Sequence, residues 1–238
     1  MNPGGITSDN GQGASLIHEP SEDDLDAFAA TFTTLGSLHR TAPGPEQLST
    51  LLGMINEWPR KGCLAAGAHH PAVSSGLTMW RLSCDKAESW QDVASDHDRL
   101  YGDSAVAVVA PYESVHRSEE GLVFDEHTLQ VRTCYARLEL VTPNMNREPD
   151  DHIGLELDFL AQGCLHALDA RESHDTDQSH HVLMVVADFL HTHVLVWAPS
   201  FLSRVTEYAR TSFMQGVALL TIGTMDEFDE CLVEHRHW

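Results

Sequence analysis

Basic residues are scarce in this 238-residue sequence, which has 14 lysines and arginines against 36 aspartates and glutamates and a formal net charge of −22. Sequence-independent binding to nucleic acids needs Lys and Arg to replace phosphate counterions, and anionic membrane surfaces attract polybasic segments. The composition therefore argues against a nucleic-acid partner and against an anionic membrane surface. The acidity either provides solubility or attracts a basic ligand, and charge alone leaves both readings open.

The sequence also lacks a pattern of paired cysteines. It has five cysteines, an odd number, and no C-x-x-C pair. Cys134 and Cys164 lie among apolar residues at helical spacing, so we expect them to be small core residues. A reducing cytoplasm fits this usage best.

Local signatures of common active sites are missing. There is no G-x-G-x-x-G or G-x-x-x-x-G-K-[ST] loop, no H-E-x-x-H and no G-x-S-x-G. These absences remove the usual sequence signals for nucleotide binding, zinc proteolysis and serine hydrolysis. We expect no cofactor and no enzymatic activity.

Membrane and export signals are not evident either. No uncharged apolar run reaches the length of about 18 residues that a membrane span needs. The first 20 residues are rich in Gly, Ser and Asn and lack the charged-then-apolar order of a signal peptide. We expect residues 1–20 to form a disordered tail and the protein to be cytoplasmic, with no membrane contact.

Helical periodicity dominates the remainder of the chain. Ser21 and Asp24 form a cap-like pair before an apolar stripe, and Pro45 suits the first position of a second helix. The pattern predicts an all-α fold of some eight to ten helices over residues 21–238. The expected helical segments are 21–40, 44–59, 75–102 (as one or two helices), 128–140, a helix running through 153–168, 180–197, 199–211 and 213–235, with an extended loop near 103–127.

A stretch rich in Pro and Asn, "VTPNMNREP", interrupts the helices near residues 142–148. Such composition is typical of a turn or hinge. We therefore predict two helical subdomains, about 21–141 and 149–238, joined by this hinge. A hinge of this kind permits either a monomer or a domain-swapped homodimer.

The segment "EPDDH" follows the hinge and directly precedes an apolar helix. Pro149 suits a first helical turn, and Asp150 and Asp151 suit the positive end of the helix dipole, so helix capping explains these residues without any function. It does not explain His152, which we expect to be neutral near a helix N-terminus. A peptide-binding site and a metal or catalytic site remain open alternatives.

The metal alternative has its own residues. His152 and Glu156 are four residues apart and share a helix face, and Asp151 can add a third ligand. This alternative predicts a metal-dependent helical hydrolase or metal-binding protein. The spacing is a weak signal, because di-iron bundles need E-x-x-H on two helices with further glutamates on two others, and no second E-x-x-H with that register appears.

The second unusual segment is "APYESVHRSEEG". Tyr112 follows Pro111 in a loop, and rigid loop aromatics make efficient peptide contacts. The alternative is that Tyr112 fills the core from the loop, and the sequence favours neither interpretation.

Together these segments resemble the TorD/DmsD/NarJ family of redox-enzyme maturation chaperones. The matching motifs are "DHDRLYG" (96–102), "PYESVHRSEEGLVFDEHTLQVRTCYARLEL" (111–140), "EPDDHIGLELDFL" (148–160) and "FLHTHVLVWAPSF" (189–201). The resemblance covers roughly residue 21 to the C-terminus and is strongest from 92 to 200.

The resemblance implies an all-helical chaperone with its E-P-x-D-H loop at the junction of two subdomains. Its implied client is a molybdopterin oxidoreductase of the dimethyl sulfoxide reductase class, bound through its twin-arginine signal peptide and its apo body until the cofactor is inserted. Glu148 and Asp151 are the expected receivers of the arginines, because guanidinium pairs bidentately with carboxylates. The peptide-binding residues implied by the resemblance are Pro111, Tyr112, Ser114, Glu148, Pro149, Asp151 and His152.

Overall fold

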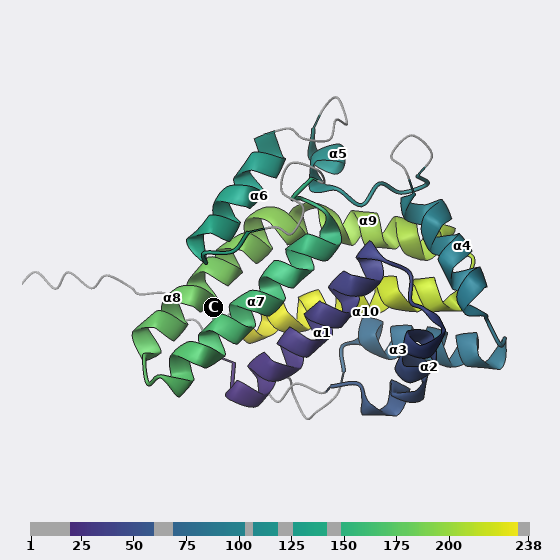
Figure 1. Cartoon of the computed structure of the whole chain (residues 1–238), viewed down its shortest axis with the longest axis horizontal. Coiled ribbons are helices and arrows are strands. Elements are labelled where there is room, and N and C mark those ends of the chain that lie inside the picture. The colour runs from purple at the N-terminus through teal and green to yellow at the C-terminus, as the bar shows by residue number, and fades with distance from the viewer. Residues whose placement is uncertain (1–19, 60–68, 103–106, 119–125, 142–148, 233–238) are drawn as a thin grey trace, which may run out of the picture.

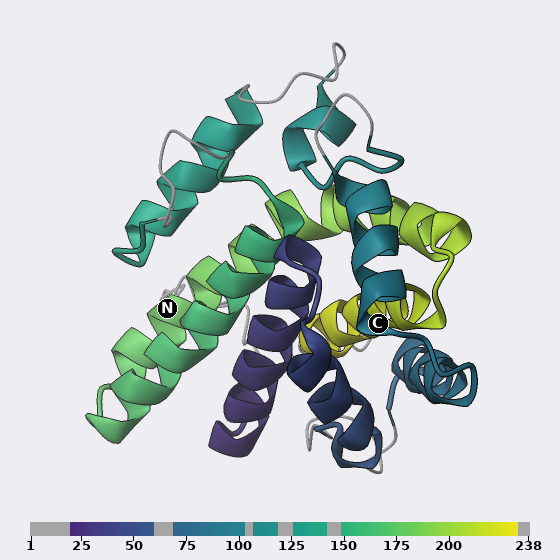
Figure 2. The same cartoon turned by 45° about the vertical axis from the view of Figure 1, so that its right-hand side comes forward.

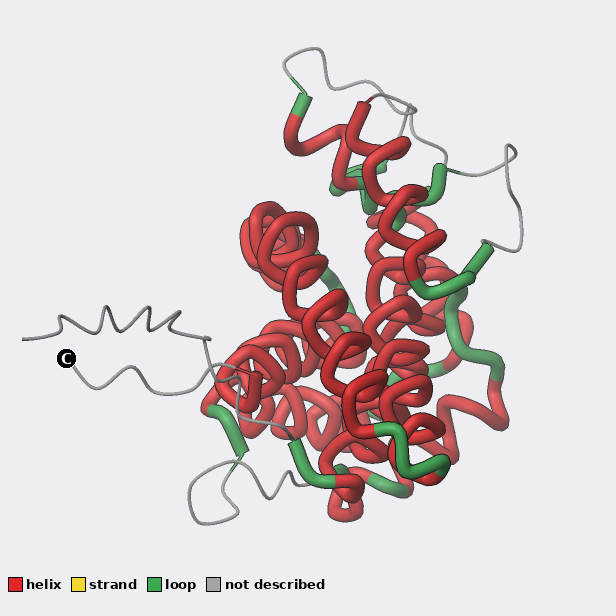
Figure 3. Tube along the Cα trace, turned by 90° about the vertical axis from the view of Figure 1, so that its left-hand side faces the viewer, coloured by secondary structure: helices red, strands yellow, loops and turns green. Residues whose placement is uncertain are grey.

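The structure is a computed structural model that describes residues 20–59, 69–102, 107–118, 126–141 and 149–232. Within these ranges the regular structure is helical and no strand is present, which confirms the all-α prediction (Figures 1 and 3). The expected tail 1–20 lies outside the described residues except for Pro20, and the expected hinge 142–148 lies wholly outside them. The helices are α1 (Glu22–Arg40), α2 (Pro45–Gly53), α3 (Pro71–Asp85), α4 (Trp90–Tyr101), α5 (Glu113–Arg117), α6 (Glu126–Arg137), α7 (Ile153–Glu172), α8 (Thr176–Phe189), α9 (Leu195–Tyr208) and α10 (Ser212–Leu232), with a 3₁₀ turn η1 (Ile55–Glu57) and a π turn η3 (Leu190–Val194).

Local signals place several helix ends where the sequence predicts them. Ser21 accepts a hydrogen bond from the Asp24 amide, and the Asp24 carboxylate accepts one from the Ser21 hydroxyl at 2.6 Å. Pro45 occupies the first turn of α2, and Gly102 is the C-cap of α4. These ends need no tertiary contact, because neighbouring residues satisfy the unpaired amides and carbonyls.

The C-terminal helices differ from the prediction at Pro199. Pro199 lies inside α9, whereas the sequence places a helix start there, and the change of helical geometry occurs earlier, at the π turn η3. A proline within a helix removes the hydrogen bond to the carbonyl four residues before it. The helix continues because Trp197 and Phe201, on either side of Pro199, are buried in the core.

One hydrophobic core joins helices from both predicted subdomains. α1 packs along α7 and against α10, and α3 packs along α10 (Figure 1). The rings of Phe28 and Phe32 lie 4.7 and 5.2 Å from that of Phe228, and Trp80 stacks on Phe213 at 5.2 Å. α5 and α6 lie at one end of this bundle, close to α8 and α9 (Figure 2). The division into two subdomains stays a prediction, because the halves share this core.

The state of the cysteines bears on the expected reducing cytoplasm, and one long apolar helix bears on the expected absence of a membrane span. Cys164 is a buried free thiol and Cys134 a half-buried one, but Cys231 is disulfide-bonded, which is uncommon in cytoplasmic proteins. The helical stretch Thr176–Tyr208 is long and apolar enough to cross a membrane, with a mean hydropathy of 1.5. That observation is weak support for a span, because core helices pass the same test and 61% of the relevant window is buried in the bundle.

The contact between α1 and α7 depends on two glycines. A Cβ atom added to Gly154 would lie 2.5 Å from the Gly36 carbonyl oxygen, and one added to Gly36 would lie 2.7 Å from the Gly154 carbonyl oxygen. Both obstacles are backbone atoms, so neither can rotate away.

We predict that Gly154→Ala lowers the free energy of unfolding by about 2 kcal/mol, because overpacking forces the two helix backbones apart. Gly53→Ala is the matched control, since a Cβ at Gly53 meets nothing within 4 Å. It should leave stability unchanged or raise it by about 0.5 kcal/mol. Urea unfolding measures both, and equal stabilities of the two variants would contradict the packing argument.

Candidate functional site

The two segments singled out in the sequence lie side by side. Tyr112 and His152 form an isolated antiparallel bridge. The Glu113 amide donates to the Asp151 carbonyl at 3.0 Å, and the Ile153 amide donates to the Pro111 carbonyl at 2.9 Å. Within the extended loop predicted near 103–127, Tyr112 thus pairs with His152 of the "PDDH" segment, and Glu113–Arg117 form α5, a helix that the sequence pattern does not predict.

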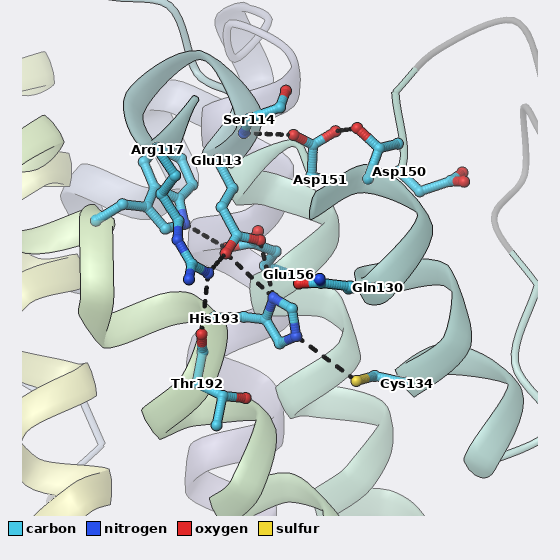
Figure 4. A network of polar contacts seen from close by, with 12 residues as sticks. Glu113, Ser114, Arg117, Gln130, Cys134, Asp150, Asp151, Glu156, Thr192 and His193 are labelled. Atoms are coloured by element: carbon cyan, nitrogen blue, oxygen red, sulfur yellow. Dashed lines mark hydrogen bonds and ion pairs between the residues drawn. The ribbon is translucent and has the colours of Figure 1, made fainter. Parts of the chain in front are cut away.

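The Asp151 carboxylate connects three elements. It is fully buried and accepts hydrogen bonds from the Ser114 amide at 2.7 Å and from the Thr128 hydroxyl at 2.8 Å (Figure 4). Ser114 belongs to α5 and Thr128 to α6, whereas Asp151 precedes α7. A buried carboxylate is costly unless donors surround it, so this group fixes the positions of α5 and α6 relative to α7.

Asp150 adds a second connection between α6 and the same loop. Its buried carboxylate pairs with the Arg132 guanidinium at 2.5 Å, and its carbonyl accepts from the Tyr135 hydroxyl at 3.0 Å. Pro149 is buried beside it. The predicted placement of Pro149 and the two aspartates in the first turn is wrong, because α7 begins only at Ile153.

His152 is the N-cap of α7. Its Nδ1 accepts a hydrogen bond from the Gly154 amide at 3.0 Å, which requires an unprotonated nitrogen. Burial, together with the positive charge of Arg40 and the proximity of His97, lowers the pKa of His152 to about 3. The expected neutral imidazole is confirmed, and its helix-capping hydrogen bond explains why a histidine is tolerated at this helix end.

A second buried network lies between α5, α6, α7 and the π turn η3 (Figure 4). The His193 Nδ1 lies 3.0 and 3.1 Å from the two carboxylate oxygens of Glu113, and Arg117 forms an ion pair with the same carboxylate. The other ring nitrogen of His193 lies 3.7 Å from the Cys134 sulfur. π turns are frequent at functional sites, and this one points His193 toward three neighbouring helices.

The ionisable groups of this network differ in their pKa values and therefore in their protonation states near neutral pH. Burial lowers the pKa of His193, but Cys134 and Glu113 outweigh it and raise that pKa to about 9. Burial favours the neutral acid at Glu113, yet His193 and Arg117 keep the pKa of Glu113 below its usual value. Glu156 behaves oppositely, because burial and the charges of Glu113 and Asp151 raise its pKa well above the ordinary range. Near neutral pH, Glu113 and His193 are charged and Glu156 holds its proton.

An open apolar cavity of about 190 Å³ borders this end of the molecule, between the last turn of α6, the residues after it, and the first turns of α7. Asp158 and Gln162 are the polar residues in its wall, and no described residue forms an ion pair with Asp158. The lining residues are Tyr135, Leu140, Val141, Leu155, Asp158, Phe159 and Gln162.

The expected peptide-binding residues are close together but mostly hidden. Tyr112 is half-buried with its ring edge against His152, at a centroid distance of 5.2 Å. Glu148 lies outside the described residues. The buried members of the set are Pro111, Ser114, Pro149, Asp151 and His152.

Sequence reasoning missed part of the site and suggested a metal centre in its place. Glu113 and His193 are 80 residues apart, so no local spacing announces their ion pair. The proposed ligands Asp151, His152 and Glu156 make separate contacts, to α5 and α6, to the Gly154 amide and to the Trp197 indole respectively. Among the described residues no group of three or more His, Cys, Asp and Glu is arranged to hold a metal.

We predict that Asp151→Asn lowers the free energy of unfolding by about 2 kcal/mol, because the amide can accept only one of the two hydrogen bonds and loses their charge assistance. Asp158→Asn, on the same helix junction but in the cavity wall, should change stability by less than about 0.5 kcal/mol. Urea unfolding of the two variants measures the difference. An Asp151→Asn protein as stable as the wild type would show that this carboxylate does not hold α5 and α6.

His193 should make stability fall at alkaline pH. Its pKa of about 9 in the folded state exceeds the ordinary value of 6.5, so the folded state binds the proton more tightly. The resulting stabilisation is complete below pH 6.5 and is lost as the pH rises toward 9. His193→Gln should abolish this loss, whereas His181→Gln, at an exposed histidine of α8, should retain it. Urea midpoints at pH 6.5 and 9 test this, and an unchanged loss in His193→Gln would refute it.

Comparison with known proteins agrees with the motifs. Residues 67–203 match the family described as nitrate reductase delta subunit. The chaperone protein TorD of Vibrio cholerae is 28% identical over 151 residues, which is 63% of this chain and 66% of the relative, so the chain spans just under two thirds of that relative's length. The Haemophilus influenzae protein named "Probable Tat proofreading chaperone DmsD" is 26% identical over 58% of this chain and 61% of its own.

Among solved structures, the Archaeoglobus fulgidus protein named "Putative Redox Enzyme Maturation Protein" aligns over 89% of this chain and 98% of its own, with 16% identity and a TM-score of 0.44. The family match covers more than half of the sequence and includes both segments of the site. The chain therefore belongs to the nitrate reductase delta subunit family, which includes the TorD and DmsD chaperones.

Proposed function

We propose that the protein is a cytoplasmic, system-specific chaperone that binds the twin-arginine signal peptide and the apo form of a molybdopterin oxidoreductase of the dimethyl sulfoxide reductase class. It holds this client until the cofactor is inserted and so prevents premature export. The observation that carries the proposal is the open apolar cavity beside the family's E-P-x-D-H element, whose wall includes the Asp158 carboxylate, with which no described residue forms an ion pair.

The relatives support the general function. TorD and DmsD are named as chaperones, and the second name specifies Tat proofreading. Neither name is that of an enzyme. Their similarity to this chain favours a maturation chaperone over a hydrolase, and no described metal-ligand cluster favours the metal-dependent alternative.

The cavity has the chemistry that a twin-arginine leader needs. Such a leader carries two guanidinium groups beside an apolar stretch. Leu155 and Phe159 offer apolar surface, while Asp158 offers a carboxylate that no described residue neutralises. Guanidinium pairs strongly with carboxylate, so an arginine at Asp158 can orient the apolar stretch in the cavity. The net charge of −22 adds a long-range attraction for a basic peptide.

Some motif residues then affect peptide binding only by positioning the helices, and others by direct contact with the peptide. Both oxygens of Asp151 already accept internal hydrogen bonds, and the His152 Nδ1 is occupied as well. We therefore assign Asp151 and His152 to positioning α6 and α7, whose facing turns form the cavity. Tyr112 is half-buried, and its exposed part remains a candidate for direct contact with the leader.

A calorimetric cycle tests the pairing at Asp158. Asp158→Asn should weaken the binding of a twin-arginine leader peptide about fivefold, because a partly exposed ion pair contributes about 1 kcal/mol. With both arginines changed to glutamine, the peptide should bind wild type and Asp158→Asn equally weakly. Asp169→Asn, an exposed position further along α7, is the matched control and should bind like the wild type.

Two outcomes would contradict the proposal. Equal affinity of wild-type protein for both peptides would remove arginine recognition altogether. A fivefold loss in Asp169→Asn as well would attribute the effect to overall charge and not to the cavity. Tyr112→Ala should also weaken binding under conditions where the variant is fully folded, if its contact with the leader is direct.

A further inference from the structure

Cys134 takes part in a thiol–imidazole–carboxylate arrangement that the chaperone function does not use. Its sulfur lies 3.7 Å from the His193 Nε2, and the His193 Nδ1 lies 3.0 Å from a Glu113 carboxylate oxygen (Figure 4). The three residues come from α6, η3 and α5. This order of groups activates cysteine nucleophiles, because the carboxylate orients the imidazole and the imidazolium stabilises the thiolate.

A further cation stands near the same sulfur. Arg137, one turn along α6 from Cys134, pairs with Asp188 of α8 at 2.7 Å and also interacts electrostatically with Cys134. Cysteines next to Arg or protonated His lose their thiol proton more easily, because the positive charge stabilises the thiolate. Cys134 is half-buried, so small reagents can reach it.

The charged and titratable groups around Cys134 are Glu113 and Arg117 on α5, Arg137 on α6, Asp151 before α7, Glu156 on α7, Asp188 on α8 and His193 on η3, and of these His193 and Arg137 interact with the thiol directly.

We propose that Cys134 is a reactive thiolate and a site of modification by low-molecular-weight disulfides. The Cys134 sulfur attacks one sulfur of the small disulfide, forms a new S–S bond, and displaces the other half as a thiolate. Cys134 is oxidised, the small disulfide is reduced by the same two electrons, and the proton on His193 stays in place. The product is a mixed disulfide on α6, next to Tyr135 in the cavity wall.

The other free cysteines provide internal controls. Cys84 is exposed, and no described side chain lies in hydrogen-bond contact with its thiol. Burial raises the pKa of Cys164 and keeps that thiol protonated. Accessibility alone therefore predicts that Cys84 reacts first, whereas activation by His193 and Arg137 predicts Cys134.

Alkylation of the full-length protein with limiting iodoacetamide, followed by peptide mass spectrometry, separates these predictions. The rate at Cys134 should reach half its maximum at a lower pH than the rate at Cys84, because His193 and Arg137 favour the thiolate only at Cys134. At pH 6 Cys134 should react about tenfold faster than Cys84, after allowance for the lower nucleophilicity of a more acidic thiol. Coincident pH profiles, or slower reaction of Cys134 at every pH, would overturn the proposal.

Charge variants identify the activating groups. His193→Gln should move the Cys134 profile toward that of Cys84, and Arg137→Gln should move it less. Arg137 is largely exposed, so its variant keeps the fold and tests the proposal even where His193→Gln is unstable. Arg204→Gln, which removes the same charge from α9, should leave the profile unchanged. An equal shift in Arg204→Gln would instead indicate a general effect of net charge and refute local activation.

A second arm tests the disulfide chemistry itself. Hydroxyethyl disulfide, an uncharged probe, should add one thiol half to Cys134 before Cys84 at pH 6.5, and Cys134→Ser should abolish the faster addition. Addition to Cys84 first would overturn the proposal. The result does not depend on any client, so it is distinct from the leader-peptide measurement.

Discussion

The arrangement of the site depends on one buried carboxylate, that of Asp151. An unpaired ionised carboxylate in the protein interior costs several kcal/mol, so the folded state must bring donors to it. The donors are the Ser114 amide and the Thr128 hydroxyl, which belong to two different helices. Satisfying Asp151 therefore places α5 and α6 relative to α7. The Tyr112–His152 bridge and the cavity between α6 and α7 both follow from that placement.

Sequence patterns predict the helices wherever a local interaction determines their ends. The Ser21–Asp24 capping box and Pro45 are examples, because the residues that satisfy the helix terminus are neighbours in sequence. The prediction is wrong at Pro199, where the local preference for a break loses to the burial of the flanking aromatic residues. It is also wrong at α5, a five-residue helix too short to show periodicity, whose second residue donates its amide to Asp151.

The site is predictable in its composition but not in its orientation. Motif order, through the family resemblance, is enough to place Tyr112 near His152. It does not reveal that Asp151 points inward, because a sequence of acids before a helix is compatible with an exposed or a buried carboxylate. The pair of Glu113 and His193 is beyond local reasoning for a different reason: its members are 80 residues apart and meet only after α8 has passed into the π turn.

Basic residues are few, so each arginine that pairs with a buried acid is one fewer to neutralise an acid at the surface. Arg117 and Arg132 pair with the fully buried carboxylates of Glu113 and Asp150, and Arg99 pairs with the buried Asp96. Each pair is neutral, so the pairs leave the net charge of −22 to the remaining residues. The cations that could have neutralised exposed acids are thereby used to stabilise interior ones. Asp158, in the cavity wall, has no ion-pair partner among the described residues, which is the arrangement that the proposed recognition of a positively charged leader requires.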